Sequence, residues 1–401
     1  MHAPANPFFT KINIPDEYFC DRKKETEKLI DLLMNGNNIV LKSPRRLGKS
    51  SLLMHVLAQP SIRDTYNTLF VDIYGTRNMM EFVKEFQSAF LEAPFALTKR
   101  GAEKVKKLLM GAYLQMNLMP DGTIGGFRVG LNPNQDMAIP LKEMFGFMEN
   151  TDKPNLVVFD EFQTILDYPE KASALVRTLT QKLGNTSFIF SGSATHLLDK
   201  MFEYPSEPFY RSAASFNLES IPMESYREFA EEMFLKYGKH IAPEAVDLVY
   251  YLFSGVTYDM QEVMKGTFSF TEKGEKADAR TVMESINDIL DRRDTDFRGI
   301  LARMENMKER KTLFCIAREG IAKGMTSSAM MSRYHLDNAS SVQHALATLC
   351  GEQKNLVRRM GKAYLIRDRM FELWIARSER RLAGMVGHAW ERYQKEMELM
   401  P

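Results

Sequence analysis

The chain has 401 residues, which is long enough for two or three domains that each bury a core. Its 53 Lys and Arg residues balance its 52 Asp and Glu residues, so the overall charge favours neither nucleic acid nor a membrane surface. The three cysteines are scattered and lack metal-ligand spacing, which predicts reduced thiols. The sequence has no apolar run near the roughly 18 residues that span a bilayer, and its N-terminus lacks a signal-peptide pattern. We therefore expect a cytoplasmic protein with no membrane partner.

Residues 1–21 are predicted to form an extended arm rich in proline and phenylalanine. In a nucleotide-binding domain an aromatic side chain of such an arm packs on the base, and the alternative is a peripheral strand that caps the core. Asp21 is expected to cap a helix that runs to Met34 and stops at Gly36.

Residues 38–53 organise the rest of the chain. A β-branched run ends at Leu41, a turn-rich loop follows, and an apolar helix opens on Gly48-Lys49-Ser50. This order is typical of a P-loop, in which backbone N–H groups and the positive end of a helix surround a triphosphate. Lys49 is expected along the β- and γ-phosphates, and the Ser50 hydroxyl on Mg²⁺. The predicted nucleotide-binding residues of the loop are Ser43, Pro44, Arg45, Arg46, Leu47, Gly48, Lys49, Ser50 and Ser51.

This loop departs from the usual pattern in its first half. Ser43 stands where the first glycine is usual, which would strain the backbone if its φ were positive, and Pro44 has no N–H to donate. The alternative to a P-loop is an accidental basic turn.

The next segment is predicted to contain a strand over residues 68–74 and an amphipathic helix over residues 79–92. The pattern loosens between about residues 95 and 150, which we interpret as an elaboration on the core. It contains a basic helix over residues 99–107, either a solvated face or a partner surface, and a glycine-rich hairpin over residues 121–131.

Residues 156–159 are four apolar residues that run into the carboxylate pair Asp160-Glu161. Such a run predicts a strand buried on both faces that delivers its acids at the carboxyl edge of a parallel sheet, beside the P-loop. There Asp160 would hold Mg²⁺ and Glu161 would deprotonate the attacking water. The alternative is an ordinary strand that ends in two solvated acids.

Two further strands are predicted after a helix over residues 170–183. The first, residues 187–193, carries Ser191 and Ser193, either of which would lie near the γ-phosphate or the water, unless both are plain turn serines. The second, residues 214–218, follows Arg211, which is either a charge-stabilising arginine, in cis or from a neighbouring subunit, or a surface salt-bridge residue.

This combination of elements resembles an AAA+ ATPase core. More narrowly, Ser-Pro-Arg-Arg-Leu-Gly-Lys-Ser-Ser-Leu at residues 43–52 and Phe-Asp-Glu-Phe-Gln at residues 159–163 resemble the archaeal-type ATPases of the STAND group, relatives of origin-recognition ATPases. Phe19, Arg22 and Glu25 are similar to the aromatic and Arg-x-x-Glu element that this family carries upstream.

The resemblance covers most of residues 6–375 and implies ATP or ADP with Mg²⁺ as ligands. It assigns phosphate, metal and base roles to Lys49, Ser50, Asp160 and Glu161, places Phe19 and Arg22 at the nucleotide, and makes Arg211 a candidate finger. Residues 253–258 match the family's Gly-Gly-x-Pro lid signature only in part, so a nucleotide-sensing role of the lid is not implied.

Three segments follow the predicted nucleotide-binding domain of residues 1–221. Residues 222–304 are predicted to form a helical lid, residues 305–375 a winged helix of three helices and a hairpin, and residues 376–401 an amphipathic helical tail. The tail is expected to be a packing or oligomer contact rather than a membrane anchor.

The winged helix carries a local positive charge. Residues 305–382 contain fifteen Lys and Arg residues against eight Asp and Glu residues, with Arg358, Arg359 and Lys362 in the predicted wing. This excess favours DNA phosphate contacts, but the predicted recognition helix offers few base-reading side chains, and internal packing is the alternative.

The predicted fold is therefore α/β: an AAA+-like P-loop core on a parallel sheet, a helical lid and a C-terminal winged helix. The first functional hypothesis is a slow ATPase whose lid and winged helix rearrange with the nucleotide. The alternatives are a regulatory or scaffold protein locked by a bound nucleotide, and a DNA-binding initiator or transposition-type helper. A homo-oligomer or a protein partner fits each of them.

Overall fold

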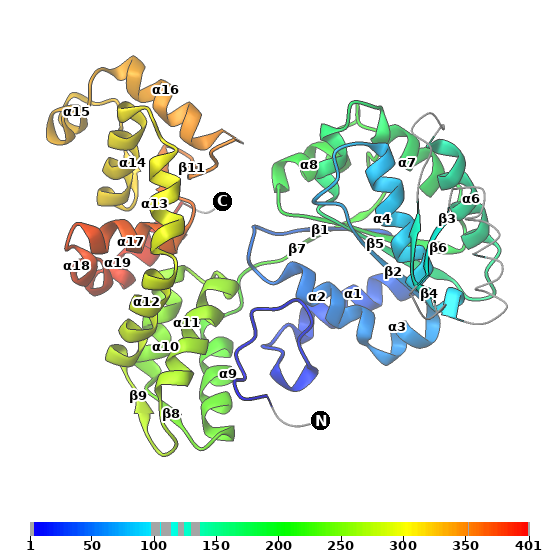
Figure 1. The fold of residues 1–401 in the computed structure, drawn as a ribbon, viewed down its shortest axis with the longest axis horizontal. Helices are drawn as coiled ribbons and strands as arrows, with labels where there is room; N and C mark the ends of the chain where they lie inside the picture. Colours follow the sequence, from blue (N-terminus) through cyan, green and yellow to red (C-terminus); the bar gives the residue numbers. More distant parts are fainter. Residues whose placement is uncertain are drawn as a thin grey trace. The chain divides into compact units, whose positions relative to one another are not determined.

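The computed structural model describes residues 4–97, 105, 114–118, 124–129, 137–351 and 353–399 (Figure 1). The chain divides into two compact units. Residues 11–16 and 22–219 form one, which we call the sheet unit, and residues 1–10, 17–21 and 220–401 form the other, which we call the helical unit. The arm that the sequence assigns to the first domain is therefore shared between the two units.

The sheet unit is built on five parallel strands in the order β2-β5-β6-β1-β7. The strands are β1 (Ile39–Lys42), β2 (Asn67–Asp72), β5 (Asn155–Asp160), β6 (Thr186–Gly192) and β7 (Ala214–Asn217). Because the strands are parallel, the residues that follow β1, β2, β5 and β6 meet at one edge of the sheet.

Helices cover both faces of this sheet, which explains why its central strands β5 and β6 are buried along almost their whole length. In Figure 1, α1 (Lys23–Met34), α2 (Lys49–Ala58) and α3 (Pro60–Thr65) lie on one side. The helices α4 (Met79–Glu92), α6 (Ala138–Glu149), α7 (Ala172–Thr180) and α8 (Thr195–Glu203) cover the other, around a core rich in phenylalanine. The aromatic rings of Phe82, Phe86 and Phe188 stack on Phe159 at centroid distances of 5.6–6.3 Å.

Between α4 and α6, the 3-10 helix η2 (Pro94–Leu97) is followed by an antiparallel pair, β3 (Leu114–Leu118) and β4 (Ile124–Val129). The predicted hairpin over residues 121–131 is wrong in its bounds: β4 lies within that range, but its partner β3 lies entirely before it. The predicted basic helix over residues 99–107 lies outside the described residues apart from position 105.

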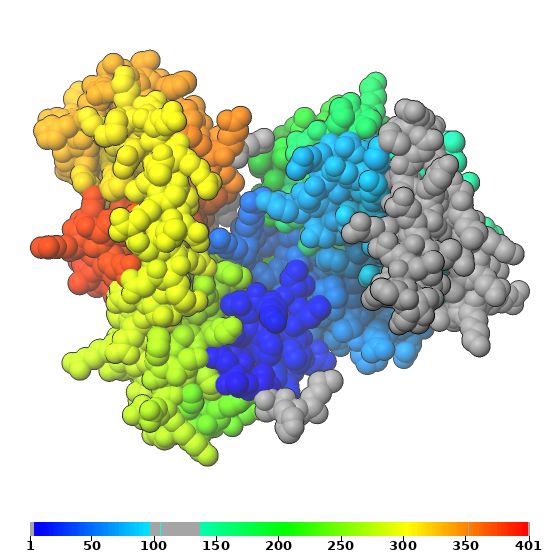
Figure 2. All heavy atoms as spheres, viewed as in Figure 1, coloured from blue at the N-terminus to red at the C-terminus, as the bar shows by residue number. Residues whose placement is uncertain are grey.

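The segment of the helical unit that the sequence predicts to be helical, residues 222–304, contains α9 (Met223–Lys236), α10 (Pro243–Phe253), α11 (Thr257–Phe270), α12 (Ala279–Arg292) and α13 (Asp294–Ala302). A parallel pair of two-residue strands, β8 (His240–Ile241) and β9 (Lys276–Ala277), joins two of the loops. The N-terminal arm packs on these helices, as the dark blue and yellow-green atoms in Figure 2 show. Phe8 is 1% exposed among Phe229, Phe234 and Phe268, so this part of the arm completes a helical core and is not a strand.

A winged helix follows. It comprises α14 (Met307–Glu319), β10 (Ala322–Lys323), α15 (Ser328–Tyr334), α16 (Ala339–Cys350), β11 (Val357–Met360) and β12 (Ala363–Ile366), with sheet order β10-β12-β11. The chain ends in α17 (Arg369–Ser378), α18 (Leu382–Gly387) and α19 (Ala389–Met397). No helix in the described part of the chain has the length and apolar character that a bilayer crossing requires.

The predicted cap of α1 is wrong by one residue. Arg22, in the left-handed region at φ 70°, precedes α1 in place of Asp21, and its side chain makes no capping hydrogen bond. Asp21 is itself in the left-handed region at φ 53°, whereas a capping side chain usually belongs to an extended residue.

Candidate functional site

Four side chains from three segments meet at the carboxyl edge of the sheet. Lys49 begins α2, Asp160 ends β5 and Ser191 lies near the end of β6. The Lys49 ammonium is ion-paired with the Asp160 carboxylate and donates to Ser191 Oγ at 3.0 Å. Ser191 Oγ donates to Asp160 Oδ1 at 2.8 Å, and Ser50 Oγ donates to Asp160 Oδ2 at 2.5 Å. The sequence predicted that these residues would come together, and the structure brings them together.

The environment of this edge changes the acidity of its carboxylates in opposite directions. Burial would raise the pKa of Asp160, but the Lys49 charge and the bonds from Lys49, Ser50 and Ser191 outweigh it and lower the pKa below its usual value. Asp160 is therefore an anion at neutral pH, as a magnesium ligand must be.

Asp72 is a third carboxylate at this edge that the sequence reasoning did not single out. It ends β2 directly beside Asp160 in the parallel register. Although Asp72 is exposed, partial desolvation raises its pKa, the neighbouring charges of Asp160 and Glu161 raise it further, and the hydrogen bond from the Tyr74 N–H opposes them. The only signal in the sequence was an acid at the end of a predicted strand, which on its own is common.

Glu161 is held by several donors. Its backbone is in the left-handed region at φ 54°. Its Oε2 accepts hydrogen bonds from Ser193 Oγ at 2.7 Å and from Gln163 Nε2 at 2.5 Å, and its Oε1 lies 3.4 Å from Lys49 Nζ. Gln163 fits beside β6 because Gly192 has no side chain: a Cβ there would lie 1.9 Å from Gln163 Oε1. The structure thus identifies Gln163 as a positioning residue for Glu161, a role that sequence reasoning had not assigned to it.

Ser43 is not among the P-loop residues with a left-handed backbone conformation. Ser43 is fully buried and not in the positive-φ region, and its N–H donates to the Gly192 carbonyl at 3.3 Å. The left-handed residues are Arg46 at φ 69° and Gly48 at φ 86°. Serine is therefore tolerated in place of the usual first glycine. Of the other loop residues, Pro44, Arg45 and Arg46 are exposed, Leu47 is buried, and Gly48, Ser50 and Ser51 are half-buried.

The upstream element that carries part of the family resemblance supports the P-loop. Arg22 is 3% exposed, and its guanidinium donates to the Leu47 carbonyl at 3.3 Å and to Glu25 Oε1 at 2.7 Å. Arg22 thereby ties the start of α1 to the backbone of the loop. Phe19 is half-buried and belongs to the helical unit.

Two predicted arginines have different surroundings. Arg45, from the loop, donates to Ser193 Oγ at 3.3 Å and lies over the Tyr74 ring. Arg211 is exposed, in the left-handed region at φ 51°, with its guanidinium over the Tyr210 ring at 5.1 Å. It precedes β7, whose first residue Ala214 pairs with Ile39 at the start of β1. Arg211 thus lies toward the amino edge of the sheet, and the structure does not bring it to its own phosphate-binding edge.

The residues at the carboxyl edge fit a magnesium ion that is held together with a nucleotide. No group of three or more His, Cys, Asp or Glu side chains within the described ranges could hold a metal by itself. Mg²⁺ usually takes one or two protein oxygens and fills its other positions with water and substrate phosphates. Ser50 and Asp160 would supply those protein oxygens.

The three predicted cations of the wing, Arg358, Arg359 and Lys362, have different interaction partners and different exposure. Arg358 is ion-paired with Glu396 of α19, and that carboxylate is only 3% exposed. Arg359 donates to the Gly361 carbonyl at 2.9 Å and lies over the Tyr364 ring, whereas Lys362 is exposed. Internal packing, one of the two predicted roles of this region, therefore accounts for Arg358.

Comparisons with known proteins bear on the whole architecture. Residues 295–377 match a family model described as "Probable winged helix domain". No curated protein matches the chain. A solved Walker-type ATPase of Pyrococcus abyssi has a TM-score of 0.62 at 18% identity and covers 92% of this chain and 99% of its own.

Two solved proteins of Aeropyrum pernix are also similar. The ORC2 protein, solved in ADPNP and ADP complexes, has a TM-score of 0.57 at 12% identity, over 95% of this chain and 96% of its own. The ORC1 protein, solved in complex with DNA, has a TM-score of 0.50 at 12% identity, over 94% of this chain and 98% of its own.

The fold and the site together define the class. The chain has the fold of Walker-type P-loop ATPases, with a five-stranded parallel sheet and a C-terminal winged helix. The predicted fold class is confirmed. The STAND group and the roles of the individual site residues remain predictions.

Proposed function

We propose that this protein binds Mg·ATP at the carboxyl edge of its sheet and hydrolyses it slowly as a conformational switch. The observation that carries the proposal is the convergence of Lys49, Ser50 and Asp160, with Glu161 beside them. A buried lysine and a hydroxyl at the start of a P-loop helix, with an ionised carboxylate at the end of a neighbouring strand, are the groups that a magnesium triphosphate requires.

Each residue has a distinct part in this reaction. The Lys49 ammonium would leave Asp160 for the β- and γ-phosphates and neutralise the charge that develops on them. Ser50 and Asp160 would hold Mg²⁺, and Ser191 would keep both Lys49 and Asp160 oriented. Glu161 would accept the proton of the attacking water, and Ser193 and Gln163 would position its carboxylate.

Slow turnover is proposed because the base is restrained. Two hydrogen bonds, from Ser193 Oγ and Gln163 Nε2, occupy Glu161 Oε2, so this oxygen must lose at least one donor before it can accept a proton from water. The nucleotide state would then set the arrangement of the helical lid and the winged helix.

The test separates binding from hydrolysis. Isothermal titration with Mg·ATP and phosphate release are measured on the full chain. Lys49→Ala should abolish binding, while Glu161→Gln should keep binding and stop phosphate release. Lys24→Ala, which removes an exposed lysine of α1, is the matched control and should behave like the wild type. Hydrolysis at the wild-type rate by Glu161→Gln would contradict the assignment of the base.

A second candidate is a regulatory or scaffold protein in which the nucleotide is a structural ligand. The bonds on Glu161 favour it as well, since a base that is never released gives no turnover. The nucleotide that copurifies with the protein distinguishes the two: ADP that does not exchange over hours supports the second candidate, and exchange with steady phosphate release supports the first.

DNA binding through the winged helix is the third candidate, and the similarity to a protein solved with DNA favours it. Arg359 and Lys362 would supply phosphate contacts. Duplex DNA titrated at several salt concentrations tests it. A linear fall of log affinity with log salt supports it, and the absence of binding at low salt removes it.

If Arg211 acts as a finger, its position at the amino edge implies that it acts on a neighbouring subunit.

A further inference from the structure

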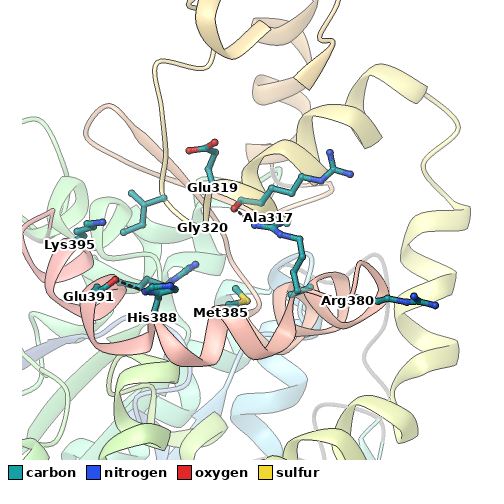
Figure 3. A pocket seen from close by; sticks show the side chains of 14 residues that line it. Ala317, Glu319, Gly320, Arg380, Met385, His388, Glu391 and Lys395 are labelled. Carbon is teal, nitrogen blue, oxygen red and sulfur yellow. Dashed lines mark hydrogen bonds and ion pairs between the residues drawn. The ribbon is translucent and has the colours of Figure 1, made fainter. Parts of the chain in front are cut away.

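The helical unit contains a cavity of about 660 Å³ that lies far along the chain from the P-loop. Its walls are the last turn of α14 with the following Gly320, the segment from Arg380 to Met385, and one face of α19. Figure 3 shows Lys395, Glu391, His388, Met385 and Arg380 in a row beneath Glu319 and Gly320. A cavity of this volume has the size of a small-molecule site.

Two arginines that line the cavity are anchored on the same turn. The Arg381 guanidinium donates to the Arg318 carbonyl at 2.8 Å. The Arg392 guanidinium lies against Gly320, where an added Cβ would come within 2.5 Å of its Nη1. Glu372 fixes Arg392 with two hydrogen bonds of 2.6 and 2.9 Å. Arginines held in this way lose little freedom on binding an anion, and each retains N–H groups that its anchor does not use.

One face of α19 extends this wall. Arg392 and Lys395 are three residues apart, so they lie on the same side of the helix, and His388, directly before the helix and four residues before Arg392, lines the same cavity. Lys395 and Arg380 are exposed, and their side chains have no hydrogen-bond or ion-pair partner in the described part of the chain. Lys395 is thus a cation that a ligand can use without breaking an existing pair.

The carboxylates of the lining are already engaged. Glu319 accepts from the Tyr334 hydroxyl and from Arg333 at 3.2 Å, and Glu391 is paired with His388 at 2.7 Å. Behind the lining, Glu379 is bonded to Arg318 at 2.6 Å. Because these acids are occupied, they do not compete for Lys395, whereas the Arg380 side chain is directed away from the other labelled side chains (Figure 3).

The remaining lining indicates what else the ligand contains. Ile321, Ala376 and Met385 give the cavity an apolar part that suits an organic group. No aromatic side chain lines it, so it lacks the stacking platforms that single-stranded nucleic acids require. Arginine forks on a small, partly apolar cavity are typical of phosphate recognition.

We propose that this cavity binds a small phosphorylated molecule with at least two negative charges, held between Arg381 and the His388, Arg392 and Lys395 face of α19. The site is separate from the P-loop and does not depend on nucleotide hydrolysis there. Nothing in the proposed ATPase reaction uses these residues.

The experiment uses inorganic pyrophosphate as the probe on the full chain carrying Lys49→Ala, so that the P-loop does not contribute. Isothermal titration should show one site. Adding Arg381→Gln with Lys395→Gln should weaken binding about tenfold or more, because two charge-assisted contacts are lost. Met385→Glu, which adds a negative charge to the wall, should weaken it as well. The matched control, Lys276→Gln with Lys323→Gln, removes two exposed positive charges from outside the cavity and should change the affinity by less than about twofold.

Four outcomes would overturn the proposal. They are no binding at millimolar pyrophosphate, equal binding by the Arg381→Gln and Lys395→Gln protein, binding of a hexaglutamate peptide in preference to pyrophosphate, and loss of duplex DNA binding in the same double variant. Thermal unfolding of each variant verifies that it is folded. ATP binding by the protein with an intact Lys49 is measured separately, so failure here is distinct from failure of the proposed ATPase.

Discussion

The ammonium of Lys49 and the carboxylate of Asp160 form an ion pair, although 111 positions separate the two residues in the chain. The two side chains are 6% and 5% exposed, and Ser191 bonds to both of them. A buried pair of this kind is costly to desolvate and is retained where the charges serve another purpose. In the proposed function, a triphosphate would take the lysine and a magnesium ion would take the carboxylate.

Replacing Ser191 with alanine tests how much the hydroxyl contributes to this arrangement. Ser191→Ala removes a fully buried group that bonds to Lys49 and Asp160, and we expect unfolding free energy to fall by about 1–3 kcal/mol in denaturant titration. Ser61→Ala, at an exposed position of α3, is the control and should change it by less than about 0.5 kcal/mol. Equal values for the two variants would show that the hydroxyl contributes no net stability.

The raised pKa of Asp72 predicts that replacing this residue with asparagine gives a pH-dependent gain in stability. Its native pKa is raised, mainly by partial desolvation, so its ionisation destabilises the fold as the pH rises through that pKa. Asp72→Asn should therefore raise the melting temperature at pH 8 and lose this advantage below the usual pKa of an aspartate, about 3.9. Thermal unfolding of both proteins across this pH range measures the difference. An advantage that grows on acidification would contradict the prediction.

Asp160 should behave in the opposite sense. Although burial opposes it, the Lys49 charge lowers the native pKa, so the stability that Asp160 supplies is complete above about pH 4 and is lost as the pH falls toward the native pKa. The loss of stability in Asp160→Asn relative to wild type should therefore be largest at neutral pH and should shrink in acid. Urea titrations at several pH values measure it, and a constant difference would refute the assigned direction.

Glu372 lies at the centre of a buried charge network in the helical unit. It is 0% exposed and bonds to Arg369 at 2.6 Å and to Arg392 at 2.6 and 2.9 Å. Glu372→Gln leaves two buried guanidiniums without their anion, and we expect a loss of about 3–5 kcal/mol in unfolding free energy. Glu379→Gln breaks a more exposed pair with Arg318 and should cost at most about 1 kcal/mol. A reversed order of the two losses would contradict the network.

Comparing alanine substitutions at Gly320 and Gly361 separates the cost of a steric clash from the cost of an unfavourable backbone conformation. Its φ of 70° disfavours other residues, and a Cβ would lie 2.5 Å from Arg392 Nη1. Gly361 also has a positive φ, 56°, but open space around it. Gly361→Ala should cost about 1 kcal/mol for the backbone alone, and Gly320→Ala should cost more because Arg392 must also move. Thermal unfolding compares the two, and equal shifts would mean that Arg392 yields freely.

Much of the fold could be predicted because its signals are local. The P-loop depends on a strand, a turn and a helix start that are contiguous in the chain. The apolar run of β5 indicates a buried strand even when the neighbouring strands are not known. The winged helix likewise follows from helix and hairpin patterns within about 80 residues, and a family model matches it. The parallel order of the strands then places Lys49, Asp160 and Ser191 at one edge.

The contacts that could not be predicted join residues whose local patterns carry no sign of each other. Asp72 became part of the site only because β2 pairs with β5, and Gln163 reaches Glu161 only because Gly192 leaves space beside it. Arg211 was placed toward the amino edge by the register of β7 with β1. Arg358, predicted as a DNA contact, is paired with Glu396 at the far end of the tail.

The sequence by itself determined the elements, the P-loop and the class of fold, because hydrogen bonding within a turn and apolar periodicity are properties of adjacent residues. Only the tertiary structure decided which donors hold Glu161, which acid joins Asp160, and which cations of the helical unit remain free to bind a ligand. These contacts depend on strand register, on burial and on which ion pairs form, and all three are set when segments distant in the sequence pack together.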